Sequence, residues 1–199
     1  MDDNKGMETS SPIILFDFFG LFVDDPYRHL FAELIGPDFN ATKDRFCGPG
    51  DKGEITYDQF LHNIGEHFHR DPNELKERAR RYAVVHPEMF ALAKRCKEAH
   101  PTYLLSNTMG GMIEDYVPQE EVQACFHRLF LSNEMGLIKP AREAFDYVLD
   151  ALSVAPSQVY FFDDNPRNVD AAKQVGINAF LFLTVDECEK QLRHLGVKC

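Results

Sequence analysis

The chain has 199 residues, of which 44% are apolar and 17 are Phe, so it can bury the core of one domain, with or without a small insertion. Its formal net charge of -11 at pH 7 argues against nucleic acid and anionic membranes as partners, because both need a basic protein surface. Residues 1–11 lack an apolar run and no later run is long enough to span a membrane, so we expect a cytoplasmic protein with a disordered N-terminal tail.

Five cysteines are present, an odd number without CxxC or other metal-ligand spacing. In a cytoplasmic protein this pattern predicts reduced thiols rather than disulfides or a metal site. We expect a monomer or a weak homodimer whose partner is a small molecule. The cysteines are Cys47, Cys96, Cys125, Cys188 and Cys199.

Five short apolar runs, bounded by turn-forming or charged residues, predict β-strands. Between most of them lie segments with apolar residues three or four apart, which predict helices at 87–99, 141–152, 168–175 and 185–195. Alternating strands and helices favour an α/β fold with a doubly wound parallel, Rossmann-like sheet, whose sites lie at the carboxyl ends of the strands. The predicted strands are 13–16, 102–105, 128–131, 159–162 and 178–183.

A stretch of about sixty residues after the first strand contains no convincing strand and is too long for an ordinary connection. Amphipathic patterns predict helices at 25–35, 56–68 and 72–83, while Gly48-Pro49-Gly50 is typical of a local turn. We therefore expect a small helical cap of residues 24–86, inserted into a core of residues 1–23 and 87–199. A cap over the site would move about hinges at 23–24 and 85–87.

Most of the residues able to do chemistry directly follow predicted strands, and Lys139 precedes Pro140 at the start of a predicted helix. A strand-end carboxylate can act as a nucleophile, and paired carboxylates suit a hard cation such as Mg²⁺. A hydroxyl, an amide and an ammonium group can hold phosphate oxygens. The candidates in chain order are Asp17, Ser106, Asn107, Lys139, Asp163 and Asp164.

Four segments carry a resemblance to a known family: IILFDFFG from residue 13, YLLSN from 103, GLIKP from 136 and VYFFDDN from 159. In this order they resemble the four motifs of the haloacid dehalogenase-like hydrolases, most of which are Mg²⁺-dependent phosphatases with an aspartate nucleophile. The last three segments, with the cap run Gly53-Glu54-Ile55-Thr56, are most similar to the phosphatase subgroup that includes a sugar-1-phosphate phosphatase and the N-terminal domain of soluble epoxide hydrolase.

The resemblance implies a role for each candidate. Asp17 would be the nucleophile and a metal ligand, together with Asp164 and the main-chain carbonyl of Phe19, whereas Asp163 would contact the metal less directly. Ser106, Asn107 and Lys139 would bind the transferring phosphoryl group, and Lys139 would also offset the charge of the carboxylates. The implied reaction is hydrolysis of a small phosphorylated metabolite through an aspartyl-phosphate.

Phe19 stands where the family's phosphatases usually carry the Asp that protonates the leaving group. One interpretation is a phosphatase that acts on good leaving groups or takes its proton from a cap histidine, His62, His67 or His69. A second is a phosphate- and metal-binding regulatory protein with little turnover. The third, a 2-haloacid dehalogenase, needs no proton donor but is disfavoured by the paired acids, since the dehalogenases of this family use no metal.

Overall fold

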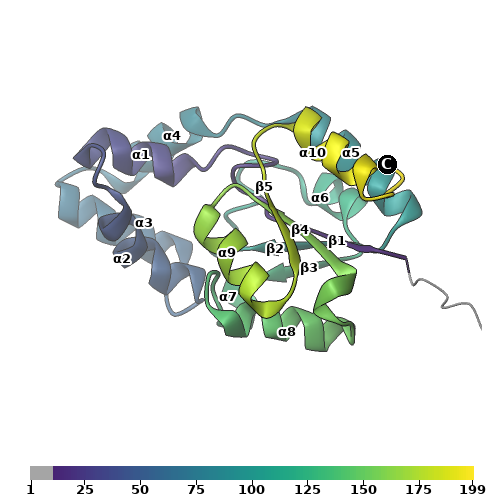
Figure 1. The fold of residues 1–199 in the computed structure, drawn as a ribbon. Coiled ribbons are helices and arrows are strands. Elements are labelled where there is room, and N and C mark those ends of the chain that lie inside the picture. The colour runs from purple at the N-terminus through teal and green to yellow at the C-terminus, as the bar shows by residue number, and fades with distance from the viewer. Residues whose placement is uncertain (1–10) are drawn as a thin grey trace, which may run out of the picture.

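The computed structural model describes residues 11–199, and its centre is a five-stranded sheet in which all strands are parallel. The strand order is β3-β2-β1-β4-β5 (Figure 1). The doubly wound sheet predicted from the sequence is therefore confirmed; the predicted N-terminal tail lies outside the described residues apart from Ser11. The strands are β1 (Ile13–Phe16), β2 (Thr102–Ser106), β3 (Arg128–Leu131), β4 (Val159–Asp163) and β5 (Asn178–Leu181).

Helices cover both faces of the sheet (Figure 1). Successive side chains of β1 point to opposite faces of the sheet. Ile14 and Phe16 pack in the cluster that contains α5, α6 and α10, whereas Ile13 and Leu15 pack against α8 and α9. No helix among residues 11–199 has both the length and the apolar character to cross a membrane. The core helices are α5 (Pro87–Ala99), α6 (Gln119–Cys125), α7 (Ser132–Met135), α8 (Arg142–Leu152), α9 (Pro166–Val175) and α10 (Val185–His194), with a 3₁₀ turn, η1 (Pro156–Gln158).

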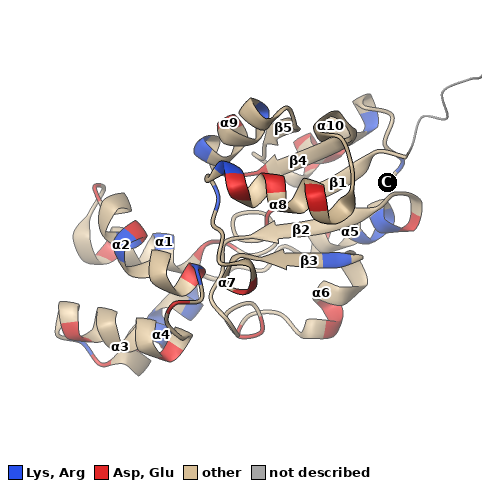
Figure 2. Ribbon diagram, turned by 90° about the horizontal axis from the view of Figure 1, so that it is seen from below, with Lys and Arg blue, Asp and Glu red and all other residues tan. Residues whose placement is uncertain are grey.

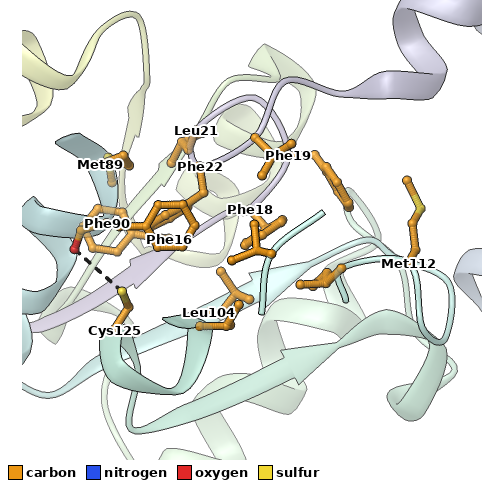
Figure 3. Packing of buried hydrophobic residues seen from close by; sticks show 14 of the residues in the cluster. Phe16, Phe18, Phe19, Leu21, Phe22, Met89, Phe90, Leu104, Met112 and Cys125 are labelled. Atoms are coloured by element: carbon orange, nitrogen blue, oxygen red, sulfur yellow. Dashed lines mark hydrogen bonds between the residues drawn. The ribbon is translucent and has the colours of Figure 1, made fainter. Parts of the chain in front are cut away.

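Aromatic packing holds the turn that follows β1. The ring of Phe22 lies 6.0 Å from that of Phe16 and 5.0 Å from that of Phe90, centroid to centroid, in edge-on geometry (Figure 3). Phe18 stacks on Phe22 at 5.7 Å. Each such buried side chain contributes about 1.5–3 kcal/mol, so the backbone on both sides of Asp17 is fixed by apolar contacts rather than by the polar site itself.

Residues 24–86 form a separate layer of helices beside the carboxyl edge of the sheet (Figures 1 and 2). Three of the four helices were predicted, and each starts at a side-chain cap: Asp25, Thr56 and Asp71 accept hydrogen bonds from the first-turn N–H groups. The helices are α1 (Pro26–Ile35), α2 (Asn40–Asp51), α3 (Tyr57–Phe68) and α4 (Pro72–Tyr82).

Helix α2 corrects the sequence analysis. The segment Gly48-Pro49-Gly50, predicted to be a local turn, lies inside the last turn of α2. Pro49 cannot donate an N–H to the carbonyl one turn earlier, yet the helix continues past it, and Lys52 donates its N–H to the Gly48 carbonyl at 3.0 Å. The turn residues therefore end a helix instead of breaking it, which places Asp51 at a helix C-terminus.

Two adjacent backbone segments join the cap to the core. Asp24 donates its N–H to the Val84 carbonyl at 3.0 Å, and His86 donates to the Phe22 carbonyl at 2.9 Å. The His86 ring also meets the Asp24 carboxylate at 3.0 Å. Both crossings thus lie side by side at the predicted hinges, and we propose the boundaries at 24 and 86 on this basis.

One prediction concerning the cysteines is wrong. Cys96 of α5 and Cys199 at the end of the described chain form a disulfide, with Cα atoms 4.4 Å apart. The other three, Cys47, Cys125 and Cys188, are buried free thiols as expected. This pair could not be predicted from the sequence, because its members are 103 residues apart and come together only when α5 and the C-terminal segment pack on the same face.

The cap also touches the core through the loop after α2. Gly53 has a φ of +73°, and a Cβ added there would lie 2.3 Å from the main-chain oxygen of Asn133 in α7. Only glycine therefore allows the cap loop to lie so close to the core.

Gly53→Ala should destabilise the protein more than Gly136→Ala. Gly136 has a similar φ of +69° but nothing within 4 Å of an added Cβ. Gly136→Ala should therefore lower the free energy of unfolding only by the cost of a left-handed backbone, about 1–2 kcal/mol. Urea unfolding of both variants measures the difference. Equal losses would show that the cap loop does not depend on this close contact.

Candidate active site

Asp17 lies directly after β1, at the carboxyl edge of the sheet and next to β4. Its N–H donates to the Phe162 carbonyl at 2.9 Å, which continues the pairing of the two strands. Its Oδ1 accepts from the N–H of Phe18 at 2.7 Å and lies 2.8 Å from the Lys139 ammonium. Strand order reverses between β1 and β4, and such switch points are where open α/β sheets place their sites.

Lys139 is a buried cation enclosed by oxygen atoms. Its Nζ donates to the Leu105 carbonyl and to Asp163 Oδ2, both at 2.7 Å, and pairs with Asp17. Burial lowers the pKa of Lys139, but the carboxylates of Asp163 and Asp17 outweigh this effect and raise it, so the ammonium keeps its charge. Asn107 fixes the Lys139 backbone by accepting from its N–H at 2.9 Å and donating to its carbonyl at 2.8 Å.

Asp163 and Asp164 have different surroundings although they are adjacent. Asp163 is fully buried, and its oxygens accept from Lys139, from the Asn165 N–H at 2.8 Å and from Asn168 Nδ2 at 3.0 Å. Asp164 lines the cavity described below and pairs through Oδ2 with Arg28 at 2.7 Å. A cation entering from the cavity therefore meets Asp164, while Asp163 holds Lys139 in place.

The three carboxylates form a cluster suited to a divalent cation. One oxygen each of Asp17, Asp163 and Asp164 lies within 4.8 Å of the others. Burial is the largest cause that raises the pKa of Asp17 and of Asp164, and the neighbouring carboxylates add to it in both cases. Gly20 leaves room for this approach, because a Cβ there would lie 2.4 Å from the Asp164 carboxyl carbon.

The fit to Mg²⁺ rests on this donor set of hard oxygen ligands. Among residues 11–199, no backbone N–H donates to the Phe19 carbonyl, so that oxygen is free to join the carboxylates. Asn168 Oδ1 is also buried and has no donor within the described chain. The expected cofactor therefore agrees with the chemistry of the site.

A cavity of about 240 Å³ opens over the cluster. The core contributes part of its wall, including Asp17, Phe19 and Lys139, and the cap contributes the rest from α1, α2 and the N-cap of α1. Figure 2 shows acidic and basic residues on α2, one of the cap helices whose residues line this cavity. The cap residues with charges on the wall are Asp25, Arg28, Lys43, Asp44 and Asp51.

Sequence reasoning missed these cap residues. Arg28 reaches Asp164, and Lys43 pairs with Asp25 at 3.0 Å. No motif marks them, because charged residues on an amphipathic helix ordinarily face solvent. They are found only once the packing of the cap over the sheet is known.

Two sequence expectations need adjustment. Ser106 is fully buried at the end of β2 and is absent from the cavity wall, whereas Asn107 lines it. The cap histidines are exposed, and none of His62, His67 and His69 lines the cavity. His62 pairs with Glu66 on the surface of α3, so the prediction of a histidine proton donor from the cap does not fit the structure.

A family model for haloacid dehalogenase-like hydrolases matches residues 13–176, which include every site residue described above. The chain belongs to this family of hydrolases. Its match confirms the resemblance inferred from the four motifs.

Individual relatives agree with the family. The D-ribitol-5-phosphate phosphatase of Bacteroides thetaiotaomicron is 26% identical over 84% of this chain and 89% of its own length. Rat bifunctional epoxide hydrolase 2 is 34% identical, over only 31% of this chain and 11% of its own. A Bacteroides thetaiotaomicron enzyme of the family, solved with magnesium and inorganic phosphate, has the same fold with a TM-score of 0.71 and 22% identity, over 88% of this chain and 96% of its own.

Lys139→Met should destabilise the protein at pH 7 by about 3–5 kcal/mol, because two buried carboxylates lose their shared cation. The loss should shrink as the pH falls, since a buried carboxylate with a raised pKa costs free energy only while it is ionised. Chemical unfolding in EDTA at pH 5 and pH 7 measures both effects.

Lys94→Met is the control, because Lys94 pairs with Glu121 at 2.6 Å in a partly exposed setting. Lys94→Met should lower the free energy of unfolding by no more than about 1 kcal/mol at either pH. A similar loss for both variants would contradict the importance assigned to the buried pairing.

Proposed function

We propose that this hydrolase is an Mg²⁺-dependent phosphomonoester phosphatase that works through an aspartyl-phosphate on Asp17. The observation that carries the proposal is the buried arrangement at the sheet edge. Lys139 lies between Asp17 and Asp163, while Asp164 faces the cavity. A nucleophilic carboxylate, a fixed cation and a further metal-binding carboxylate thus meet on one wall.

The chain's own groups account for the first half of the reaction. One oxygen of Asp17 is held by the Phe18 N–H and by Lys139, which orients the carboxylate. Its other oxygen attacks phosphorus, the new O–P bond forms as the ester P–O bond breaks, and water later displaces phosphate from the aspartyl-phosphate. Lys139 offsets the charge that gathers on the phosphoryl oxygens.

Asp17, Asp164 and the Phe19 carbonyl would hold Mg²⁺, with Asp163 as a more distant contact. When bound, Mg²⁺ reduces the repulsion between the attacking carboxylate and the phosphate. The buried Oδ1 of Asn168 can accept a hydrogen bond from a water in this site. Asn107 lines the cavity, and we assign phosphate binding to its main-chain N–H, because its side chain is engaged with Lys139.

The size of the cavity favours a small phosphorylated metabolite as the substrate. Its volume of about 240 Å³ accommodates a small monoester, and the cap places Arg28 and Lys43 opposite the core site. The similarity to a D-ribitol-5-phosphate phosphatase over most of both chains supports a substrate of this size. Phe19 offers no proton, so substrates with good leaving groups should react most readily unless another group supplies one.

Activity towards an aryl phosphate should require Mg²⁺ and vanish in Asp17→Asn, because an amide is a poor nucleophile and replaces a metal ligand. Phosphate release is measured with Mg²⁺ and with EDTA. Turnover in EDTA, or in the variant, would overturn the mechanism. Binding of Mg²⁺ and phosphate by the wild type without any turnover would identify the binding protein considered in the sequence analysis.

Asp164→Asn should weaken Mg²⁺ binding more than Asp163→Asn, since Asp164 faces the cavity and Asp163 is saturated by Lys139, Asn165 and Asn168. Calorimetric titration of Mg²⁺ into both variants tests the order, and unfolding curves show that each is folded. The reverse order of affinities would exchange the two roles.

A further inference from the structure

The replacement of the usual acid by Phe19 leaves one step without a donor. An alkoxide leaving group needs a proton as its bond to phosphorus breaks, and a positioned acid is worth about 10²–10⁴ in rate. Phe19 lies on the cavity wall, with its ring packed edge-on against Phe18 and Tyr116. The cap histidines are outside the cavity, so a donor has to be sought among the groups that line it.

Three carboxyl groups of the cap face the cavity, and two of them are engaged. Asp25 caps α1 and pairs with Lys43, and these contacts outweigh burial and lower its pKa. Asp44 pairs with Arg167 at 3.5 Å and has a side chain that is 61% exposed. Asp25 is therefore a carboxylate near neutral pH, whereas a proton donor must hold its proton. Asp44 is held by Arg167 at the solvent-exposed side of the cavity wall.

Asp51 differs from both. Within residues 11–199, no group donates a hydrogen bond to its carboxyl or forms an ion pair with it. It is the last residue of α2, where the negative end of the helix dipole disfavours a second negative charge. An unpaired carboxyl at this position, on the wall of the same cavity as Asp17 and Lys139, has the surroundings of a general acid.

The charges around Asp51 agree with that role. Burial is the main cause that raises the pKa of Asp51 to about 7; Lys43 opposes it, Asp25 and Asp44 add to it, and Lys139 opposes it from the core side. The Cys47 thiol, one turn earlier on α2, is uncharged because its own pKa is raised by burial. A carboxyl with this pKa is protonated in about half of the molecules at pH 7.

Other proton-bearing groups on the wall are poorer donors. The Tyr27 hydroxyl is bonded to that of Tyr57 at 2.7 Å, and burial raises the pKa of Tyr27 far above its usual value. Lys139 uses its protons on Leu105, Asp17 and Asp163, and guanidinium groups do not release theirs.

We propose that Asp51 is the general acid that protonates the leaving group, in place of the missing carboxyl at position 19. This inference rests on the proposed phosphatase function. As Asp17 bonds to phosphorus and the ester P–O bond breaks, the leaving oxygen takes the Asp51 proton and departs as an alcohol. Water then attacks phosphorus, the Asp17–phosphate bond breaks, and the proton released by the water returns to the Asp51 carboxylate.

The test compares Asp51→Asn with Asp44→Asn, a matched change two turns earlier on α2. With Mg²⁺, Asp51→Asn should lower kcat/KM for an alkyl phosphate about 10²–10⁴-fold but change that for p-nitrophenyl phosphate less than about fivefold, since nitrophenolate leaves without a proton. Asp44→Asn removes one of the charges that raise the pKa of Asp51 but leaves the Asp51 carboxyl in place, so it should change the ratio of the two rates far less than Asp51→Asn does. Equal losses on both substrates for Asp51→Asn would overturn the proposal.

Two further readouts do not depend on that ratio. The alkyl phosphate activity of the wild type should fall as the pH rises through about 7, and this fall should be absent from Asp51→Asn. A carboxyl ¹³C resonance that is lost in Asp51→Asn should titrate near the same pH; a midpoint near 4 would mean that Asp51 is ionised at neutral pH and would overturn the proposal.

The outcomes also separate this inference from the function on which it rests. If the wild type cleaves p-nitrophenyl phosphate with Mg²⁺ and Asp17→Asn does not, the phosphatase function stands whatever Asp51→Asn does. If the wild type cleaves neither substrate, both the function and the role of Asp51 are wrong.

Discussion

The buried ammonium of Lys139, shared between Asp17 and Asp163, is the interaction on which the rest of the site depends. Two carboxylates in an apolar interior repel each other and lose hydration, so bringing β1 and β4 together at these residues costs much more free energy near neutral pH without a cation. Asn107 fixes the backbone of Lys139 from the end of β2. The ends of β1, β2 and β4 are thereby joined into one unit, and Asp164, which follows β4, faces the cavity and pairs with Arg28 of the cap.

The parts of this unit could be predicted from the sequence because each depends on short-range pattern. Buried parallel strands read as continuous apolar runs, and all five were found within a residue or two of their observed ends. The polar residues directly after them must meet at one edge of the sheet. The pattern did not reveal how the two residues at the end of β2 differ. The side chain of Asn107 positions Lys139, and Ser106 is buried away from the cavity.

The cap was harder to predict because its details depend on tertiary contacts. Gly48-Pro49-Gly50 has the composition of a turn, yet the helix continues through it. Cys96 and Cys199 meet only through the packing of distant segments. Arg28, Lys43 and Asp51 look like ordinary surface charges until the cap is placed over the sheet edge. Local sequence thus predicted three of the four cap helices, but neither α2 nor the helix faces that became part of the site.

An uncharged side chain at position 19 limits the negative charge of a cavity that already has many carboxyl groups. The cavity already contains Asp17 and Asp164 from the core and three carboxyl groups from α2 and the start of α1. A further carboxylate two residues from Asp17 would raise the repulsion that Lys139 has to offset. The aromatic ring instead extends the packing of Phe18 and Tyr116 to the cavity wall. Phe19 therefore keeps a further negative charge out of the core, and the carboxyl that we propose as the general acid, Asp51, lies on the cap side of the same cavity.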